Sequence, residues 1–258
     1  MPRYKLTIEY DGTPYLGWQV QDEGTTVQGR LAQAITAFTG ETVLPYGAGR
    51  TDSGVHATGQ IAHIDLAQPR EPFVIRNAIN NHLAPEPISV LDAEAVDATF
   101  DARFSATQRH YLYRIWNRPA FLALEQNRAW YVPQPLNEAA MHESAQALVG
   151  RHDFTTFRSV HCGAKSPVKR LSAITVTRNK HMIIVTVSAP SFMHNQVRSI
   201  VGSLKQVGIG KWPVTGIATA LAACDRAACG PVAPSAGLYL TGVDYAAAEV
   251  SADENVAK

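Results

Sequence analysis

The 258-residue sequence is poor in cysteine, and its three cysteines (Cys162, Cys224 and Cys229) form no Cys-x-x-Cys pair. Such a sparse, odd set argues against a disulfide framework and against a structural zinc site, so we expect buried or idle thiols. The sequence also lacks an apolar run long enough to span a bilayer, and no apolar signal segment precedes the strand-like start of the chain. These absences predict a cytoplasmic protein with no membrane partner.

Three common catalytic patterns are missing as well. The glycine-rich stretch 47–59 contains no Gly-Lys-Ser/Thr, which excludes a phosphate-binding P-loop, and no Gly-x-Ser-x-Gly surrounds Ser53, which excludes a serine-hydrolase elbow. Residues 9–13, Glu-Tyr-Asp-Gly-Thr, resemble the phosphatase pattern Asp-x-Asp-Gly-Thr but carry Glu9 at the nucleophile position. The long alternation of strands and helices that the phosphatase fold requires does not follow, so we reject that class.

The net charge is only +1, but it is distributed unevenly along the chain. Residues 1–100 carry a net charge of −6, residues 101–210 carry +9 and residues 211–258 carry −2. An asymmetry of this size suggests that the middle section presents a positive surface to a polyanion such as a nucleic acid. Basic strand and helix faces that only contact solvent would give the same counts, so charge alone leaves both interpretations open.

The hydrophobic pattern predicts a mixed α+β protein. The first unit is expected to contain a strand at 5–10, a helix from Thr25 or Thr26 to Gly40, a short strand near 42–46, a strand at 60–66, a helix at 72–82 and a strand at 88–92. The second is expected to contain a strand at 111–116, a helix from Asn137 to Gly150, a hairpin of 173–177 and 182–187, helices at 196–207 and 215–223, and a strand at 237–243.

This order predicts two similar mixed α/β halves with a cleft between them. We place the first half at residues 1–104 and the second, which carries the basic surface, at 105–245. The small, polar tail 246–258 is expected to be disordered.

Four glycines crowd the stretch 47–59, where they let the backbone turn tightly and approach a ligand closely. Arg50, Asp52 and His56 are displayed among them. Because Asp-Ser-Gly is ordinary turn chemistry, this loop by itself leaves open whether Asp52 is functional.

The wider string Gly-Arg-Thr-Asp-Ser-Gly-Val-His-Ala, residues 49–57, resembles the catalytic segment of the tRNA pseudouridine synthase A family, in which the aspartate is the nucleophile. Further segments are similar to the other motifs of that family and follow in its order: 10–19, 101–107 with 111–113, 192–202 and 237–240. His110 departs from the pattern, because arginine is common before the tyrosine. This departure weakens the case for a phosphate contact at that position and leaves Tyr111 in place.

The resemblance implies a role for each matching residue. Asp52 is the catalytic carboxylate, Arg198 is its partner and would orient it through a bidentate pair, and the ring of Tyr111 stacks on the displaced uracil. Leu240 forms the pocket floor, and Arg50 fills or braces the gap left when the target nucleotide swings out of its helix.

Basic residues of the middle section are candidates for RNA phosphate contacts: Arg103, Arg158, Lys165, Lys169 and Arg170. His56 and His63 are expected to be hydrogen-bonded rather than metal ligands, and no metal site is predicted.

The implied reaction is the isomerisation of uridine to pseudouridine in the anticodon stem-loop of tRNA, at tRNA positions 38, 39 and 40. The C1′–N1 bond breaks and the uracil rejoins through C5, with no redox change or energy input, so no cofactor is expected. Whether the carboxylate adds to C6, attacks C1′ or removes a sugar proton stays open. The resemblance further implies a pseudouridine synthase fold with RNA-recognition-like halves, an antiparallel sheet and a homodimer. A non-catalytic RNA-binding module is the alternative that we retain.

Overall fold

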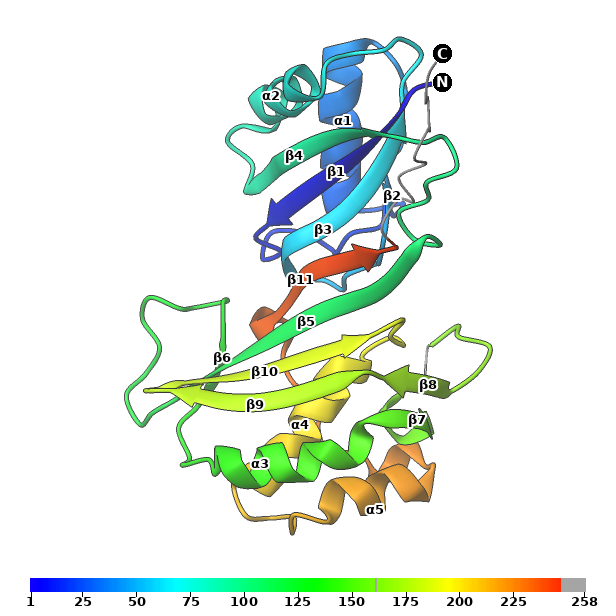
Figure 1. Cartoon of the computed structure of the whole chain (residues 1–258). Coiled ribbons are helices and arrows are strands. Elements are labelled where there is room, and N and C mark those ends of the chain that lie inside the picture. Colours follow the sequence, from blue (N-terminus) through cyan, green and yellow to red (C-terminus); the bar gives the residue numbers. More distant parts are fainter. Residues whose placement is uncertain (161, 247–258) are drawn as a thin grey trace, which may run out of the picture.

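The computed structural model describes residues 1–160 and 162–246 (Figure 1). The first half of the chain contains β1 (Arg3–Tyr10), α1 (Val27–Thr39), β2 (Tyr46–Gly47), β3 (His56–Asp65), α2 (Pro72–Leu83) and β4 (Ile88–Val96). The second contains β5 (Ala106–Asn117), β6 (Trp130–Val132), α3 (Glu138–Ala145), β7 (Gly150–Asp153), β8 (Val168–Leu171), β9 (Ala173–Asn179), β10 (Met182–Ala189), α4 (Gln196–Gly208), α5 (Gly216–Ala223) and β11 (Leu238–Tyr245). Beyond residue 246, the tail predicted to be disordered lies outside the described residues.

One sheet runs through both halves in the order β4-β1-β3-β11-β5-β10-β9, as Figure 1 shows. Most neighbouring strands are antiparallel, which confirms the predicted α+β class. The last strand, β11, lies between the halves, where it pairs in parallel with β3 and antiparallel with β5. In this register Leu240 lies opposite Ala57 on one side and Tyr111 on the other. The predicted boundary between the halves, at residues 104 and 105, falls in the connection between β4 and β5. It stays a prediction.

Two large hydrophobic clusters lie on the same face of this sheet. One joins β1 and β3 to α1 and α2, and the other joins β5, β9 and β10 to α3, α4 and α5. Leu238 and Leu240 stand two residues apart on β11 and therefore point to the same face. Leu238 belongs to the second cluster and Leu240 to the first. Helices thus cover this face in two groups, with the centre of the sheet between them.

The best-predicted elements are those with clear caps and stripes. The Thr26 hydroxyl accepts a hydrogen bond from Gly29 N at the start of α1, and Gly40 ends the helix in the left-handed region at φ 76°. Val27, Leu31 and Ile35 form its buried stripe. The β9–β10 hairpin also has the predicted strands.

The strand predictions were incomplete in several places. β2 (Tyr46–Gly47) shares only Tyr46 with the strand expected near 42–46, and β3 begins at His56 rather than at residue 60. β5 begins at Ala106 rather than at residue 111. β3 is buried on both faces along most of its length, so its sequence lacks the alternation that would mark its start. The separate β7–β8 pair was not predicted.

Candidate active site

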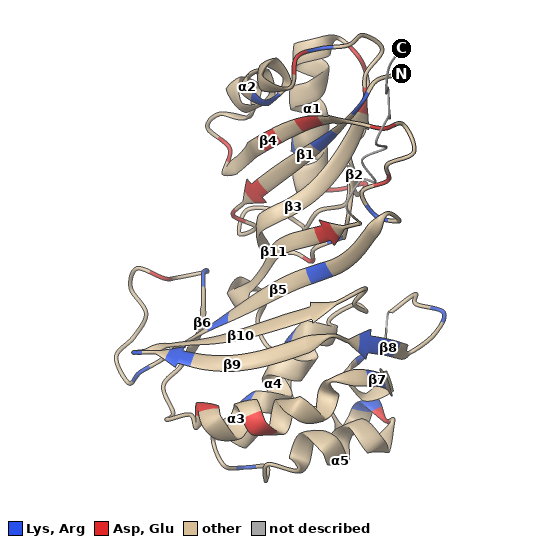
Figure 2. Ribbon diagram, viewed as in Figure 1, with Lys and Arg blue, Asp and Glu red and all other residues tan. Residues whose placement is uncertain are grey.

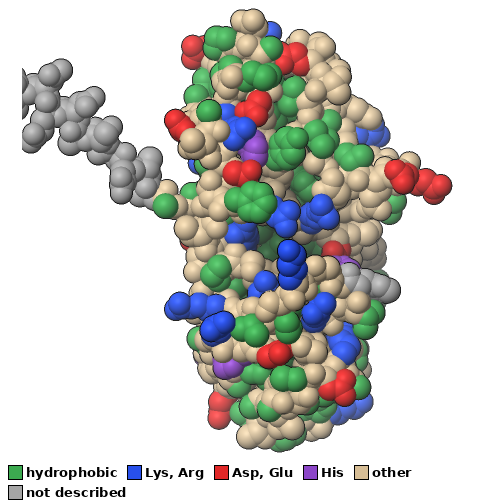
Figure 3. Space-filling model, turned by 90° about the vertical axis from the view of Figure 1, so that its right-hand side faces the viewer, with side chains coloured by type: hydrophobic (Ala, Val, Ile, Leu, Met, Phe, Trp, Pro, Cys, Tyr) green, Lys and Arg blue, Asp and Glu red, His purple; other side chains and the backbone are tan. Residues whose placement is uncertain are grey.

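A cleft of about 1150 Å³ opens on the helix-covered face between the two groups of helices. Most of its lining comes from three stretches that are distant in sequence, 47–55, 101–111 and 191–198, and the rest includes residues of 16–28, 44–46 and 162–164. Figure 3 shows a hollow in the middle of one face of the molecule, with Lys and Arg side chains around it. The guanidinium groups that line it belong to Arg50, Arg103, Arg109 and Arg198. The predicted cleft between halves is therefore present, and it is basic.

The loop that carries Asp52 is held on both sides by the end of β1 and the segment that follows it. The Tyr10 hydroxyl lies 2.8 Å from Thr51 Oγ1, and Trp18 N donates to the Thr51 carbonyl at 3.0 Å. Gly12 packs so tightly that a Cβ there would lie 2.0 Å from the Val55 carbonyl oxygen. These contacts fix the backbone on either side of Asp52, so the direction of its side chain is set by the fold.

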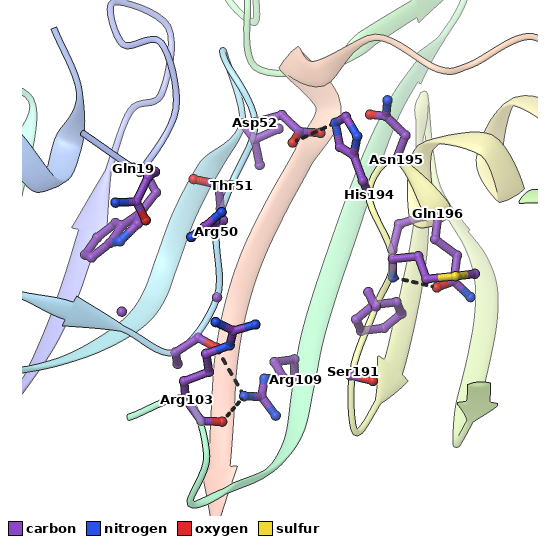
Figure 4. A pocket seen from close by; sticks show the side chains of 18 of the residues that line it. Gln19, Arg50, Thr51, Asp52, Arg103, Arg109, Ser191, His194, Asn195 and Gln196 are labelled. Carbon is purple, nitrogen blue, oxygen red and sulfur yellow. Dashed lines mark hydrogen bonds and ion pairs between the residues drawn. The ribbon is translucent and has the colours of Figure 1, made fainter. Parts of the chain in front are cut away.

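Asp52 projects into the cleft with its side chain one-third exposed, and each carboxylate oxygen faces a different basic side chain. Arg198 Nη1 lies 3.5 Å from Oδ2, and His194 Nε2 lies 3.4 Å from Oδ1. Figure 4 shows Asp52 and His194 approaching each other from opposite sides of the cleft.

The guanidinium of Arg198 is held by two further bonds. Its Nε donates to the Ala233 carbonyl at 2.7 Å, and its Nη1 donates to Asn195 Oδ1 at 2.9 Å. The prediction of a bidentate pair between Arg198 and Asp52 is therefore wrong. The Nε of Arg198 donates to the Ala233 carbonyl, and only its Nη1 reaches Asp52.

Tyr111 lies in the lining of the cleft at the centre of the sheet. Its ring contacts Phe192 edge to face, with centroids 5.1 Å apart. Burial, reinforced by the nearby charge of Asp52, raises the pKa of Tyr111 to about 12, so the hydroxyl keeps its proton at neutral pH. Leu240 is fully buried on the neighbouring strand directly across from Tyr111 and lies outside the cleft lining.

The predicted RNA-contacting residues divide into two groups. Arg50 and Arg103 line the cleft, and both side chains are exposed. Arg50 makes no hydrogen bond or ion pair with the rest of the described chain, which leaves its guanidinium available. The other four lie outside the lining: Arg158, Lys165, Lys169 and Arg170. Of these, Lys169 and Arg170 are on β8, and Arg158 donates to the Cys162 carbonyl at 2.9 Å.

Sequence reasoning missed two residues of the site, His194 and Arg109. Arg109 stands two residues before Tyr111 on the same face of β5 and donates to the carbonyls of Ala48, Arg103 and Pro190, as well as to that of Ala106. These bonds connect the three stretches that form most of the cleft lining, since Pro190 directly precedes the third of them. Arg109 could have been found from the sequence, because it lies two residues before Tyr111 on the same strand. For His194, the only signal was that it stands within a segment that matches a family motif.

The two histidines expected to be hydrogen-bonded are so, His56 through both ring nitrogens and His63 through Nδ1. Gly12 N donates to His56 Nδ1 at 3.1 Å, so Nε2 carries the proton and donates to the Asn127 carbonyl at 2.8 Å. Burial lowers the pKa of His56, which agrees with this neutral form. His63 Nδ1 accepts from Ala102 N at 3.1 Å and so supports the turn that leads to β5.

A basic cleft around a carboxylate held between two basic side chains is typical of an enzyme that acts on a polyanionic substrate. The chain matches the tRNA pseudouridine synthase family over residues 6–105 and 144–246, and it belongs to this family.

Curated relatives match along nearly the whole chain. It is 61% identical over 247 residues to the tRNA pseudouridine synthase A of Allorhizobium ampelinum, covering 95% of each chain. It is 59% identical over 245 residues to that of Afipia carboxidovorans, covering 95% of this chain and 100% of the relative. A solved structure titled "Crystal Structure of a Cbf5-Nop10-Gar1 Complex" matches at 11% identity and a TM-score of 0.36, over 78% of this chain and 45% of that one, which is too weak to support an argument. None of the described helices is long and apolar enough to cross a membrane.

Proposed function

We propose that this chain isomerises uridine to pseudouridine in the anticodon stem-loop of tRNA and that Asp52 is its catalytic carboxylate. The observation that carries the proposal is the setting of Asp52: its carboxylate projects into a basic cleft, between Arg198 and His194, in a member of the tRNA pseudouridine synthase family. A charged carboxylate in that place can act on the sugar or on the ring of a uridine that enters the cleft.

The reaction breaks the C1′–N1 bond, forms a C1′–C5 bond and moves a proton from C5 to N1. Asp52 starts it as nucleophile or base. Arg198 holds the carboxylate in place through the contact of its Nη1 with Oδ2. The Tyr111 ring would stack on the displaced uracil, and its hydroxyl remains a proton donor because the pKa of Tyr111 is raised. Leu240 supports the strand beside Tyr111 from below the cleft.

A uridine inside a helical stem must leave the stack before Asp52 can reach it. The free guanidinium of Arg50, two residues from Asp52, is suited to brace the gap that remains. Arg103 adds a further exposed positive charge in the cleft. Figure 2 shows further Lys and Arg on β8, and we assign phosphate contacts to this side of the molecule through Arg158, Lys165, Lys169 and Arg170.

We extend the proposal to a homodimer that works in the cytoplasm, as the sequence resemblance implies. Size-exclusion chromatography with light scattering measures the mass of the assembly directly, and a mass near 28.0 kDa, that of a single chain, would reject the dimer.

The decisive assay uses unmodified tRNA and detects pseudouridine by carbodiimide reactivity and primer extension. Wild-type protein should give product in the anticodon stem-loop, and Asp52→Ala should give none. RNA affinity of Asp52→Ala should stay within a few-fold of wild type, because phosphate contacts dominate affinity. RNA binding without any product from the wild-type protein would leave the non-catalytic RNA-binding module as the function.

A further inference from the structure

Two aromatic side chains stand in solvent at the edge of the cleft. Phe104 is 80% exposed and Tyr46 is 59% exposed, and both belong to the cleft lining on the side of the first half. A large ring exposed at the mouth of a basic cleft is costly in water and is typical of a surface that a ligand covers. Neither ring has a part in the steps described above.

The turn that presents Phe104 is firmly built. The Asp101 carboxylate accepts hydrogen bonds from the backbone N–H groups of Arg103 and Phe104, each at 2.8 Å. Ala102, which lies between Asp101 and Arg103, donates its N–H to His63 Nδ1 at 3.1 Å. The Ala102 carbonyl accepts a hydrogen bond from the Tyr245 hydroxyl at 2.8 Å. The exposed ring is therefore attached to fixed backbone, which lowers the entropy lost when a ligand packs against it.

Tyr46 is oriented by the same histidine. Its ring stacks on His63, with centroids 5.2 Å apart and an interplanar angle of 18°. His63 thus supports Tyr46 through its ring face and the turn before Phe104 through its Nδ1. One face of the tyrosine ring lies against His63, and much of the rest of the side chain is open to solvent.

Positive charge accompanies these rings. The Arg103 guanidinium lies over the Phe104 ring, 5.3 Å from its centroid, and Arg50 lines the same cleft. Aromatic faces beside free guanidinium groups bind single-stranded nucleic acid, because the bases stack while the cations meet the phosphates.

We propose that Phe104 and Tyr46 form a stacking site for unpaired nucleobases of the RNA, next to the position of the target uridine. This inference rests on the proposed function, from which it takes RNA as the substrate. The bases must be unpaired, because a base stacked inside a duplex has no free face to offer. The stem-loop would then be recognised in part through its open loop, and a fully paired RNA would lose these contacts.

The test measures binding rather than turnover. In an Asp52→Asn background, Phe104→Ala and Tyr46→Ala are compared with Phe73→Ala, which removes a ring that is 60% exposed on α2 outside the cleft lining. The probe is an anticodon stem-loop RNA with 2-aminopurine at single loop positions, and the readouts are Kd and the quenching of its fluorescence. Phe104→Ala should weaken binding by about fivefold to a hundredfold and relieve the quenching at one loop position. Phe104→Trp should keep both, and Phe73→Ala should change neither.

Unchanged affinity and quenching in Phe104→Ala and Tyr46→Ala would overturn the stacking site. So would an equal loss of affinity for a fully paired RNA hairpin of the same length, since stacking on open bases predicts a loss for the looped RNA alone. Pseudouridine formation by the wild-type chain is scored separately, so a failure of the proposed catalysis and a failure of the stacking site give different results.

Discussion

At the scale of single residues, the two carboxylate oxygens of Asp52 are contacted by two different basic side chains. Arg198 approaches one oxygen and His194 the other, and the Arg198 guanidinium is in turn fixed by Ala233 and Asn195. A carboxylate held in this way points into the cleft before any RNA arrives. Part of the entropy that a reactive geometry costs is therefore lost on folding rather than in the catalytic step.

Arg198→Ala tests this arrangement. It should lower kcat on the order of 100-fold, because it removes the fixed positive charge next to Asp52, the proposed catalytic carboxylate. RNA affinity should change only a few-fold, since Arg198 lies inside the cleft and two of its three hydrogen bonds go to Ala233 and Asn195. Single-turnover kinetics with a stem-loop RNA separate the two quantities. A loss of affinity as large as the loss of kcat would instead make Arg198 an RNA-binding residue.

His194 gives a second prediction. His194→Ala should reduce kcat about tenfold, because it removes the ring nitrogen that lies 3.4 Å from Asp52 Oδ1, and His194→Gln should retain more activity, because its amide can donate a hydrogen bond to that oxygen. Rates are compared under single-turnover conditions with saturating enzyme. If Gln and Ala lose activity equally, donation to Asp52 is not the role of His194.

The sequence could identify Asp52, Arg50, Tyr111 and Arg198 as candidates because each stands inside a recognisable string. It could not show that His194 faces Asp52, because that contact joins loops from opposite halves and depends on the packing of the whole chain. Nor could the sequence show how many hydrogen bonds join Arg198 to Asp52, because the competing acceptor, the Ala233 carbonyl, lies in a segment with no motif.

At the scale of elements, the segment between β1 and α1 supports the loop that carries Asp52. Gly17 adopts φ +94°, and a Cβ there would lie 2.5 Å from the Thr51 carbonyl oxygen. Together with Gly12, it lets the two backbones approach more closely than any side chain would allow. The position of Asp52 therefore depends on two glycines that lie outside the cleft lining.

Gly12→Ala should accordingly destabilise the protein by about 1–3 kcal/mol, because the new methyl group collides with the Val55 carbonyl. The same variant should lose activity beyond what its fraction of unfolded protein explains, since the loop next to Asp52 must move. Gly163→Ala is the matched control for stability, because a Cβ there meets nothing within 4 Å. Thermal unfolding followed by circular dichroism compares the two. A melting temperature of Gly12→Ala equal to that of Gly163→Ala would contradict the prediction.

Elements with local signals were the predictable ones. α1 combines a Thr cap, an apolar stripe and a terminal glycine, all of which act within a few residues of each other. β7 and β8 lacked such signals, since each is only four residues long and pairs only with the other. The start of β3 could not be predicted for a different reason. Burial on both faces removes the alternation of apolar and polar residues that marks a half-buried strand.

At the scale of the whole molecule, β11 decides where the cleft lies. The last strand of the chain enters between β3 and β5, and its parallel pairing with β3 joins two segments from opposite ends of the sequence. No local pattern predicts such a pairing, although the strand itself was predicted. The insertion brings the Asp52 loop, Tyr111 and α4 around one point on the sheet. A cleft between two helix groups is the consequence.

The same central packing makes the stability of the molecule sensitive to alkaline pH. Burial raises the pKa of Tyr10, Tyr111 and Tyr113, in the case of Tyr111 to about 12. In the unfolded chain these phenols ionise near pH 10. Below that pH both states keep their protons and the full stability is present. As pH rises from about 10 towards 12, the unfolded chain releases protons that the folded chain retains, so the free energy of unfolding falls.

We therefore expect the melting temperature to be steady up to about pH 9 and to drop steeply above about pH 10. Tyrosinate absorbance should increase in two stages, the second coinciding with unfolding, because the buried phenols of Tyr10 and Tyr113 become accessible only then. Tyr111→Phe removes one of the phenols whose pKa is raised and should lessen the alkaline loss, since phenylalanine cannot ionise in either state. Full tyrosinate absorbance near pH 10 in a protein that is still folded would show that these hydroxyls are not buried as the structure has them, and the steep loss of stability would then be absent.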